Sequence, residues 1–197
     1  METQFVREST PDPRRRKLLI RALWITIAGN VVLAIGKGIV AAVSGSVALY
    51  ADAANSISDV FYSLLMSLGL WISQKPPDPG HPQGHSRFEP LAGLVVAAAM
   101  TIAAYEAGRA AIESFLAGGM AVSVGWPTVA LLISAALKGV MYILIHRIAD
   151  RAGSTALDAA AQDNLADVLT SVAAFAGTLA SQFVHPLADP IAGLLVA

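Results

Sequence analysis

Two pairs of oxygen-bearing side chains stand in stretches that otherwise have the composition of a membrane core. Asn55 and Asp59 form the first pair, and Asp163 and Asp167 form the second. Residues at positions i and i+4 share one face of a helix, so each pair can present its oxygens together. Ionisable groups inside a membrane span are costly and by default mark an ion or proton site. If the two segments pack together, the four side chains converge, and a divalent cation would cancel most of their negative charge.

A fourth acidic residue, Asp52, lies three residues before Asn55 and on nearly the same helical face. Its position near the end of the apolar stretch is equally typical of a residue at a helix end. We therefore keep two interpretations of Asp52. It is either a helix-terminal residue, or a carboxylate in the outer shell of the ion site or on its entry path.

The composition indicates a membrane protein. Of the 197 residues, 55% are hydrophobic and only 14% are charged, whereas a soluble domain has about 25% charged residues. The formal net charge of −1 predicts no nucleic-acid partner. The chain has no cysteine, which excludes disulfides, thiolate metal sites and cysteine nucleophiles.

The apolar segments predict an all-α integral membrane protein with five complete spanning helices and the start of a sixth. Each complete segment exceeds the roughly 20 residues that a helix needs to cross the hydrocarbon. We expect residues 1–17 to form a polar N-terminal tail and residues 18–197 to form the transmembrane domain, with the sixth helix truncated. The expected helices are 18–43, 47–73, 88–116, 127–149, 155–184 and a segment from about 189.

Lys and Arg gather on one side of this arrangement. They occur before the first span, around the loop after the second span, and around the turn after the fourth, whereas the other connections contain none. By the positive-inside rule, these basic segments and the N-terminus are cytoplasmic. We expect a multi-pass protein of the plasma (inner) membrane of a prokaryote.

Four stretches, in this order, resemble the cation diffusion facilitator family: "SGSVALYADAANSISD", "GHSRFEPLAGLV", "AQDNLADVLTS" and "DPIAGLLVA". The resemblance runs from about residue 18 to the last residue. It implies a six-helix, homodimeric transporter in the lipid bilayer, not an enzyme and without a resident cofactor, that exports divalent transition metals in exchange for protons. We expect the family's C-terminal cytoplasmic domain to be absent from this chain. The residues that match the family's transport site are Asn55, Asp59, Asp163 and Asp167.

The resemblance also bears on which metal is carried. Zinc-transporting members generally have a histidine where this sequence has Asp163. An all-oxygen ligand set suits a harder cation such as Mn²⁺, and the Asp-x-x-x-Asp pair resembles the manganese branch of the family. Fe²⁺ is the next expectation, followed by Zn²⁺ or Co²⁺, while Mg²⁺ gives up its waters reluctantly.

The stretch "DPGHPQGH" places Asp78, His81 and His85 in one short loop. An exposed, proline-rich turn with incidental histidines explains this pattern. Some members of the family, however, use an aspartate and two histidines at this spacing as a minor metal site. These ligands favour zinc over manganese, and we retain the loop as a candidate second site.

Two other functions remain open. The chain could be a non-transporting membrane scaffold or metal-sensing partner that keeps the fold. It could also be an intramembrane enzyme with two aspartates sharing a proton, although proteolysis would leave Asn55 and the repeated spacing unexplained. The other charged residues within spans have structural explanations. We expect mutual salt bridges for Glu106, Arg109 and Glu113, and a partner on a neighbouring helix for Lys138.

Overall fold

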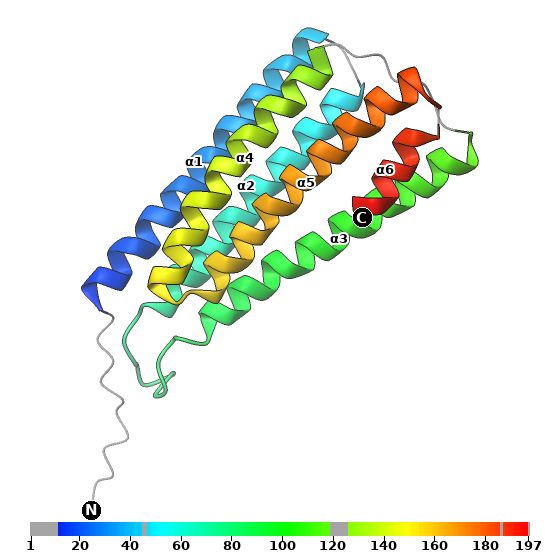
Figure 1. Ribbon diagram of the computed structural model, residues 1–197. Helices are drawn as coiled ribbons and strands as arrows, with labels where there is room; N and C mark the ends of the chain where they lie inside the picture. The colour runs from blue at the N-terminus through cyan, green and yellow to red at the C-terminus, as the bar shows by residue number, and fades with distance from the viewer. Residues whose placement is uncertain (1–11, 45–46, 119–125, 186, 197) are drawn as a thin grey trace, which may run out of the picture.

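The computed structural model describes residues 12–44, 47–118, 126–185 and 187–196, and their secondary structure is helical apart from short connections. Figure 1 shows long helices running roughly along one direction, with a short helix at the C-terminus. The predicted all-α bundle with an incomplete last helix is confirmed. The helices are α1 Pro13–Ser44, α2 Val47–Ser73, α3 Phe88–Leu116, α4 Trp126–Ala152, α5 Thr155–Phe183 and α6 Ala188–Val196.

The start of α1 differs from the prediction, because the helix begins at Pro13 rather than at residue 18. Proline suits the first turn of a helix, where its missing N–H removes no helical hydrogen bond. The Asp12 carboxylate accepts a hydrogen bond from the Arg14 backbone N–H at 2.9 Å and so caps the first turn. The basic residues 14–17, expected to lie in the tail, are therefore helical.

The helices form one group of four with two further helices beside it (Figure 1). Helix α4 packs against α1 and α5, and α1 packs against α2. Helix α3 crosses beside this group and reaches α2 and α5, while α6 lies against α3 and α5. Among the described residues, α2 and α5 do not share an extensive backbone interface. From the sequence, convergence of the two residue pairs was conditional on these helices packing together, and the described residues show no extensive interface between them.

The apolar core lies toward the end of the bundle that carries the basic residues, which we call the basic end. Its fully buried large side chains come from the start of α1 and α5 and from the later halves of α2 and α4. They are Leu19, Met66, Leu70, Met141, Ile145 and Leu157. The core fixes the relative positions of these four helices below the polar residues described next.

Close helix contacts at the basic end depend on small residues. A Cβ atom on Gly69 of α2 would lie 2.7 Å from the Cβ of Ala92 in α3, and one on Gly93 would lie 3.3 Å from the Cα of Ala156 in α5. Small residues permit such approach in membrane helices. Gly36, in contrast, faces open space.

Large apolar side chains cover much of the outer surface, including the exposed Trp24, Leu94 and Ile133. Within the described residues, four helical segments are long and apolar enough to cross a membrane: Pro13–Val43, Asn55–Ser73, Phe88–Leu116 and Val129–Ala152. Helix α5 is 29 residues long, like α3, and carries Asp158, Asp163 and Asp167. The fifth predicted span thus has the required length, and two of its aspartates, Asp163 and Asp167, lie in its interior.

Candidate metal centre

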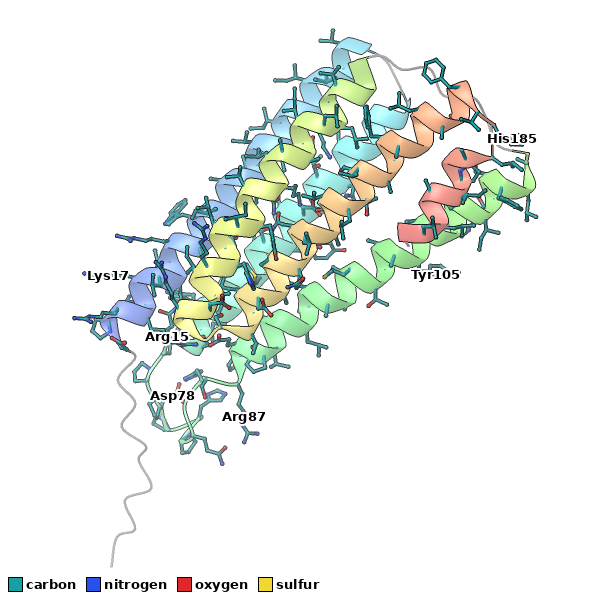
Figure 2. The ribbon with its side chains drawn as sticks, viewed as in Figure 1. Arg15, Lys17, Asp78, Arg87, Tyr105 and His185 are labelled. Atoms are coloured by element: carbon teal, nitrogen blue, oxygen red, sulfur yellow. The ribbon has the colours of Figure 1, made fainter. Side chains whose placement is uncertain are left out.

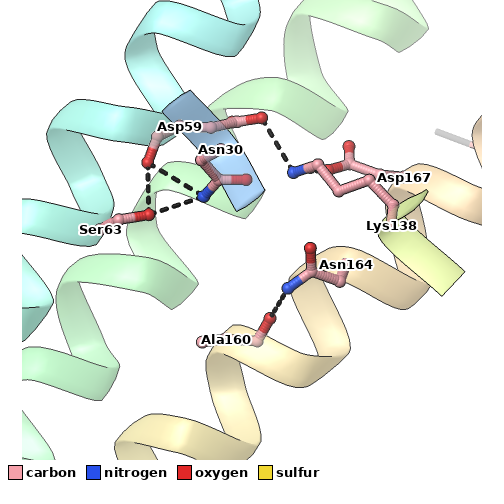
Figure 3. Close-up of polar contacts among 7 residues, drawn as sticks. All are labelled: Asn30, Asp59, Ser63, Lys138, Ala160, Asn164 and Asp167. Atoms are coloured by element: carbon pink, nitrogen blue, oxygen red, sulfur yellow. Dashed lines mark hydrogen bonds and ion pairs between the residues drawn. The ribbon is translucent and has the colours of Figure 1, made fainter. Parts of the chain in front are cut away.

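The predicted ligands Asp59 and Asp167 meet at a single cation, the ammonium group of Lys138. The Lys138 Nζ lies 3.0 Å from Asp59 Oδ2 and 2.6 Å from Asp167 Oδ2 (Figure 3). The Lys138 side chain is only 5% exposed, against 15% for Asp59 and 34% for Asp167. Carboxylates from α2 and α5 are therefore brought together by a side chain from α4, inside the bundle.

Asp163, one turn before Asp167, belongs to the same cluster of charges. It lies within electrostatic range of Asp167, Lys138 and Asp59. With Asn55 and Asp167, it lines a cleft of about 730 Å³ whose walls come mainly from α3, α5 and α6. A carboxylate at this position can reach a cation held near Asp167.

Asn55 lies at the junction of two hollows. It lines the large cleft and also a smaller cavity of about 130 Å³, whose walls include Asp59, Lys138 and Asp167. Each of the four predicted site residues thus lines the large cleft, the smaller cavity or both. The side chain of Asp52 lies outside the described part of the chain, so its interpretation stays a prediction.

A buried polar layer holds the turn of α2 that carries Asp59. Asn30 of α1 donates its amide N–H to Ser63 Oγ at 2.7 Å, and Ser63 donates its hydroxyl to the Asp59 carbonyl at 2.7 Å (Figure 3). On the α5 side, Asn164 is 2% exposed and donates to the Ala160 carbonyl at 2.7 Å. Buried polar groups of this kind require partners, and here they fix the backbone on both sides of the site.

The sequence reasoning missed Lys138 as a member of the site. The prediction that Lys138 has a partner on a neighbouring helix is confirmed, but its partners are two of the predicted ligands. A lysine deep in an apolar span was the available signal for this position. Asn30, Ser63 and Asn164 gave a similar signal, as polar residues in apolar helices.

The loop between α2 and α3 brings the three residues of the candidate second site together. One possible ligand atom from each of Asp78, His81 and His85 lies within 4.8 Å of the others. The His81 backbone N–H donates to Asp78 Oδ1 at 2.7 Å, and His85 Nε2 lies 3.4 Å from Asp78 Oδ2. A carboxylate oxygen and two imidazole nitrogens are donor atoms that bind zinc in proteins.

The loop is organised in a way that suits metal binding. The hydrogen bond from the His81 backbone holds the pKa of Asp78 below its ordinary value, because it favours the ionised carboxylate. His85 is 6% exposed, and its Nδ1 lies 3.2 Å from the Pro76 carbonyl. Such a contact orients a histidine ring and leaves its other nitrogen for a ligand.

The basic end is fastened by a second cluster. Arg15 of α1 donates from Nη2 to Glu89 Oε2 of α3 at 2.7 Å and from Nε to the Ala152 carbonyl of α4 at 2.8 Å. Figure 2 shows Arg15, Asp78 and Arg87 at this same end of the molecule. Three helix ends are thus joined by one guanidinium group.

One of the salt bridges predicted within the charged cluster of α3, between Arg109 and Glu113, is present in the structure. Arg109 Nε lies 2.8 Å from Glu113 Oε1, one turn along the helix. Both side chains are exposed, so this pair is a surface feature that contributes little to stability.

The geometry described above agrees with a family comparison. The model of the cation efflux transmembrane domain matches residues 23–197. The chain belongs to the cation efflux family. The resemblance to cation diffusion facilitators is confirmed, and the chain is a multi-pass membrane protein of a family of cation efflux proteins rather than enzymes.

Similar proteins extend over most of this cation efflux chain. It is 36% identical over 181 residues to the "Uncharacterized transporter MJ0449" of Methanocaldococcus jannaschii, covering 90% of this chain and 62% of that protein. It is 32% identical over 176 residues to the manganese efflux system protein MneS of Bacillus subtilis, covering 87% and 59%. It is also 32% identical over 165 residues to MneP of the same organism, covering 84% and 55%. The chain therefore spans less than two thirds of the length of these relatives.

Proposed function

We propose that this chain forms the transmembrane domain of a proton-coupled antiporter that exports divalent transition-metal cations from the cytoplasm. One observation carries the proposal. Asp59 and Asp167 come from two helices without an extensive common interface, yet their carboxylates lie 3.0 and 2.6 Å from one buried positive charge. A place where carboxylates from separate helices converge on a cation is a place where a metal ion can bind.

Four side chains would hold the transported ion: Asn55, Asp59, Asp163 and Asp167. They offer carboxylate and amide oxygens, which suit Mn²⁺ better than softer metals. The similarity to two proteins named as manganese efflux systems supports Mn²⁺ as the favoured substrate. Fe²⁺, then Zn²⁺ and Co²⁺, are the alternatives. Asp52 would act from the outer shell of this site.

Proton coupling follows from the charge of the site. When a divalent ion leaves, three neighbouring carboxylates share the single positive charge of Lys138, so protons binding at some of them would lower the remaining repulsion. Protons that bind on the outer side and leave on the inner side would be exchanged for metal. The basic end would be cytoplasmic, with the N-terminus, in a plasma or inner membrane, and the working unit would be a homodimer.

The loop residues Asp78, His81 and His85 would form a minor site at the cytoplasmic surface. Their imidazoles favour zinc, so this site would differ in metal preference from the oxygen-rich site within the span. The contacts between these side chains, at 3.3 and 3.4 Å, support the assignment.

Transport in proteoliposomes tests the proposal. Asp167→Asn should abolish both Mn²⁺ uptake and the accompanying proton movement, because it removes one carboxylate from the ligand set. Asp158→Asn is the matched control, since Asp158 is exposed in the first turn of the same helix. Transport by Asp167→Asn at the wild-type rate would refute the site. A folded wild-type protein that moves none of Mn²⁺, Fe²⁺, Zn²⁺ or Co²⁺ would favour the non-transporting scaffold or metal-sensing partner.

The metal preference has its own test. Asp163→His introduces an imidazole into the oxygen set and should shift the preference from Mn²⁺ toward Zn²⁺. The ratio of the two transport rates, measured in competition, reports the shift. An unchanged ratio would mean that Asp163 does not contact the transported ion.

A further inference from the structure

We propose that Lys138 is a tethered competitor of the transported metal. Its ammonium group binds Asp59 and Asp167 between transport events, and an arriving divalent cation must displace it. This inference rests on the proposed function, because it assigns a role to a residue that the ligand set of the site does not include. It identifies Lys138 as a residue that sets metal affinity and release.

The ammonium group of Lys138 is positioned between two of the proposed metal ligands. Lys138 Nζ lies 3.0 Å from Asp59 Oδ2 and 2.6 Å from Asp167 Oδ2, so it occupies the space between two proposed ligands. A Mn²⁺ ion bound to the same two oxygens would need nearly that space. The side chain and the metal therefore cannot both hold these oxygens.

The positive charge of Lys138 also opposes the binding of a second cation in the same site. At about 4 Å, two positive charges near a protein surface repel by an energy that strongly disfavours their sharing one site. The carboxylates of Asp59, Asp163 and Asp167 can be balanced by the lysine or, more completely, by the divalent ion. No change in the protonation of Lys138 is involved, because the ammonium only exchanges its position.

The Lys138 side chain is also able to move away from the two carboxylates. It belongs to α4, whereas the proposed ligands belong to α2 and α5. A lysine carries a compact charge on a flexible four-carbon stem. The cavity of about 130 Å³ beside it is lined by Lys37 and also by the hydroxyl-bearing Ser134, Thr170 and Ser171, so the displaced ammonium has hydroxyl oxygens to contact there. Metal binding can then proceed without unpacking α4 from its neighbours.

An ordinary structural ion pair predicts the opposite effect of mutation. If Lys138 only holds Asp59 and Asp167 in place, its loss should disorder the site and weaken metal binding. If Lys138 competes with the metal, its loss should strengthen binding and slow release. The two roles are therefore separated by the direction in which affinity and turnover change.

Two substitutions at Lys138 test the inference in opposite directions. Lys138→Gln removes the competing charge, and Mn²⁺ binding should become tighter by about tenfold to a hundredfold, the factor that a charge-assisted hydrogen bond represents. In vesicles, its KM for Mn²⁺ should fall together with kcat, because release becomes slow. Lys138→Arg places a planar, bidentate competitor between the carboxylates, and Mn²⁺ binding should weaken by about tenfold.

The measurements are isothermal titration of the purified protein with Mn²⁺ and initial rates of uptake into proteoliposomes. Lys17→Gln is the control, because this lysine is exposed at the start of α1, far along the chain from the site (Figure 2). Its affinity and rates should equal those of the wild type. Size-exclusion elution and the thermal midpoint establish that each variant is folded.

The outcomes separate the two proposals. Equal or weaker Mn²⁺ binding by folded Lys138→Gln would overturn the inference, while wild-type transport would leave the proposed function in place. If Lys138→Gln does not fold, Lys138→Arg still decides, because an unchanged affinity in that variant overturns the inference. A folded wild-type protein that binds no divalent cation would overturn both.

Discussion

The contact between Asp59 and Lys138 makes a prediction about stability that needs no metal. Asp59→Asn keeps the shape of the side chain but removes its charge, while Lys138 retains Asp167 at 2.6 Å. Hydrogen bonds to charged groups are worth about 1.5–3 kcal/mol, and the remaining partner limits the loss. We therefore expect Asp59→Asn to destabilise the protein by about 1–2 kcal/mol.

Lys138→Met should cost more, because it leaves two neighbouring carboxylates without their cation. Removing one partner of a buried ion pair costs about 3–5 kcal/mol, and the 34% exposure of Asp167 places this case at the lower end. In the Lys138→Met background, Asp59→Asn removes a repulsion instead of an attraction. There it should leave the stability unchanged or raise it.

Thermal unfolding in detergent with a chelator, followed by tryptophan fluorescence, measures these differences. For a chain of this size, about 1 kcal/mol corresponds to roughly 2–4 °C in the midpoint. The exposed pair of Arg109 and Glu113 provides a control cycle, in which the two substitutions should act almost independently. If Asp59→Asn lowered the midpoint equally with and without Lys138, the ion pair would not contribute to the folded protein and the reasoning would be refuted.

Three further predictions concern other parts of the molecule. Gly69→Val should destabilise the protein by about 1–3 kcal/mol, because its Cβ would lie 2.7 Å from the Cβ of Ala92. Gly36→Val is the control, since Gly36 faces open space, and equal thermal midpoints for the two variants would contradict the packing of α2 on α3. Glu89→Gln should lower stability by about 1 kcal/mol through the loss of its ion pair with Arg15, measured by the same melting assay; Arg15→Gln in that background should then add little, and full additivity would argue against the pair. His85→Asn should weaken Zn²⁺ binding to the loop by at least about tenfold without changing Mn²⁺ uptake; calorimetry that finds the wild-type Zn²⁺ affinity would exclude this histidine as a ligand.

Much of the fold follows from local signals in the sequence. Helix α2 ends at Ser73 and α3 begins at Phe88, as predicted, because the intervening proline- and glycine-rich loop cannot continue a helix. The start of α1 was placed too late, since the basic residues were interpreted as a tail. The proline at the first helical position and the aspartate before it were the signals that identify the true start.

The site was predictable only in part. The i, i+4 spacing identifies which face of α2 and of α5 carries the oxygens, and it does so from the sequence alone. It does not show what fills the space between them. That Lys138 on α4 reaches both Asp59 and Asp167 depends on how three helices pack, which depends in turn on apolar residues far from the carboxylates.

The absence of an extensive backbone interface between α2 and α5 in the described part of the chain has a mechanical consequence. Helices that interlock through ridges and grooves must lose many contacts before they separate. Around the carboxylates, the described link between α2 and α5 is the pair of ion contacts at Lys138, and the two helices are otherwise joined through α1, α3 and α4. Separating α2 from α5 at this depth would therefore break these ion pairs in addition to contacts of the intervening helices, whereas the apolar core at the basic end lies outside the polar cluster.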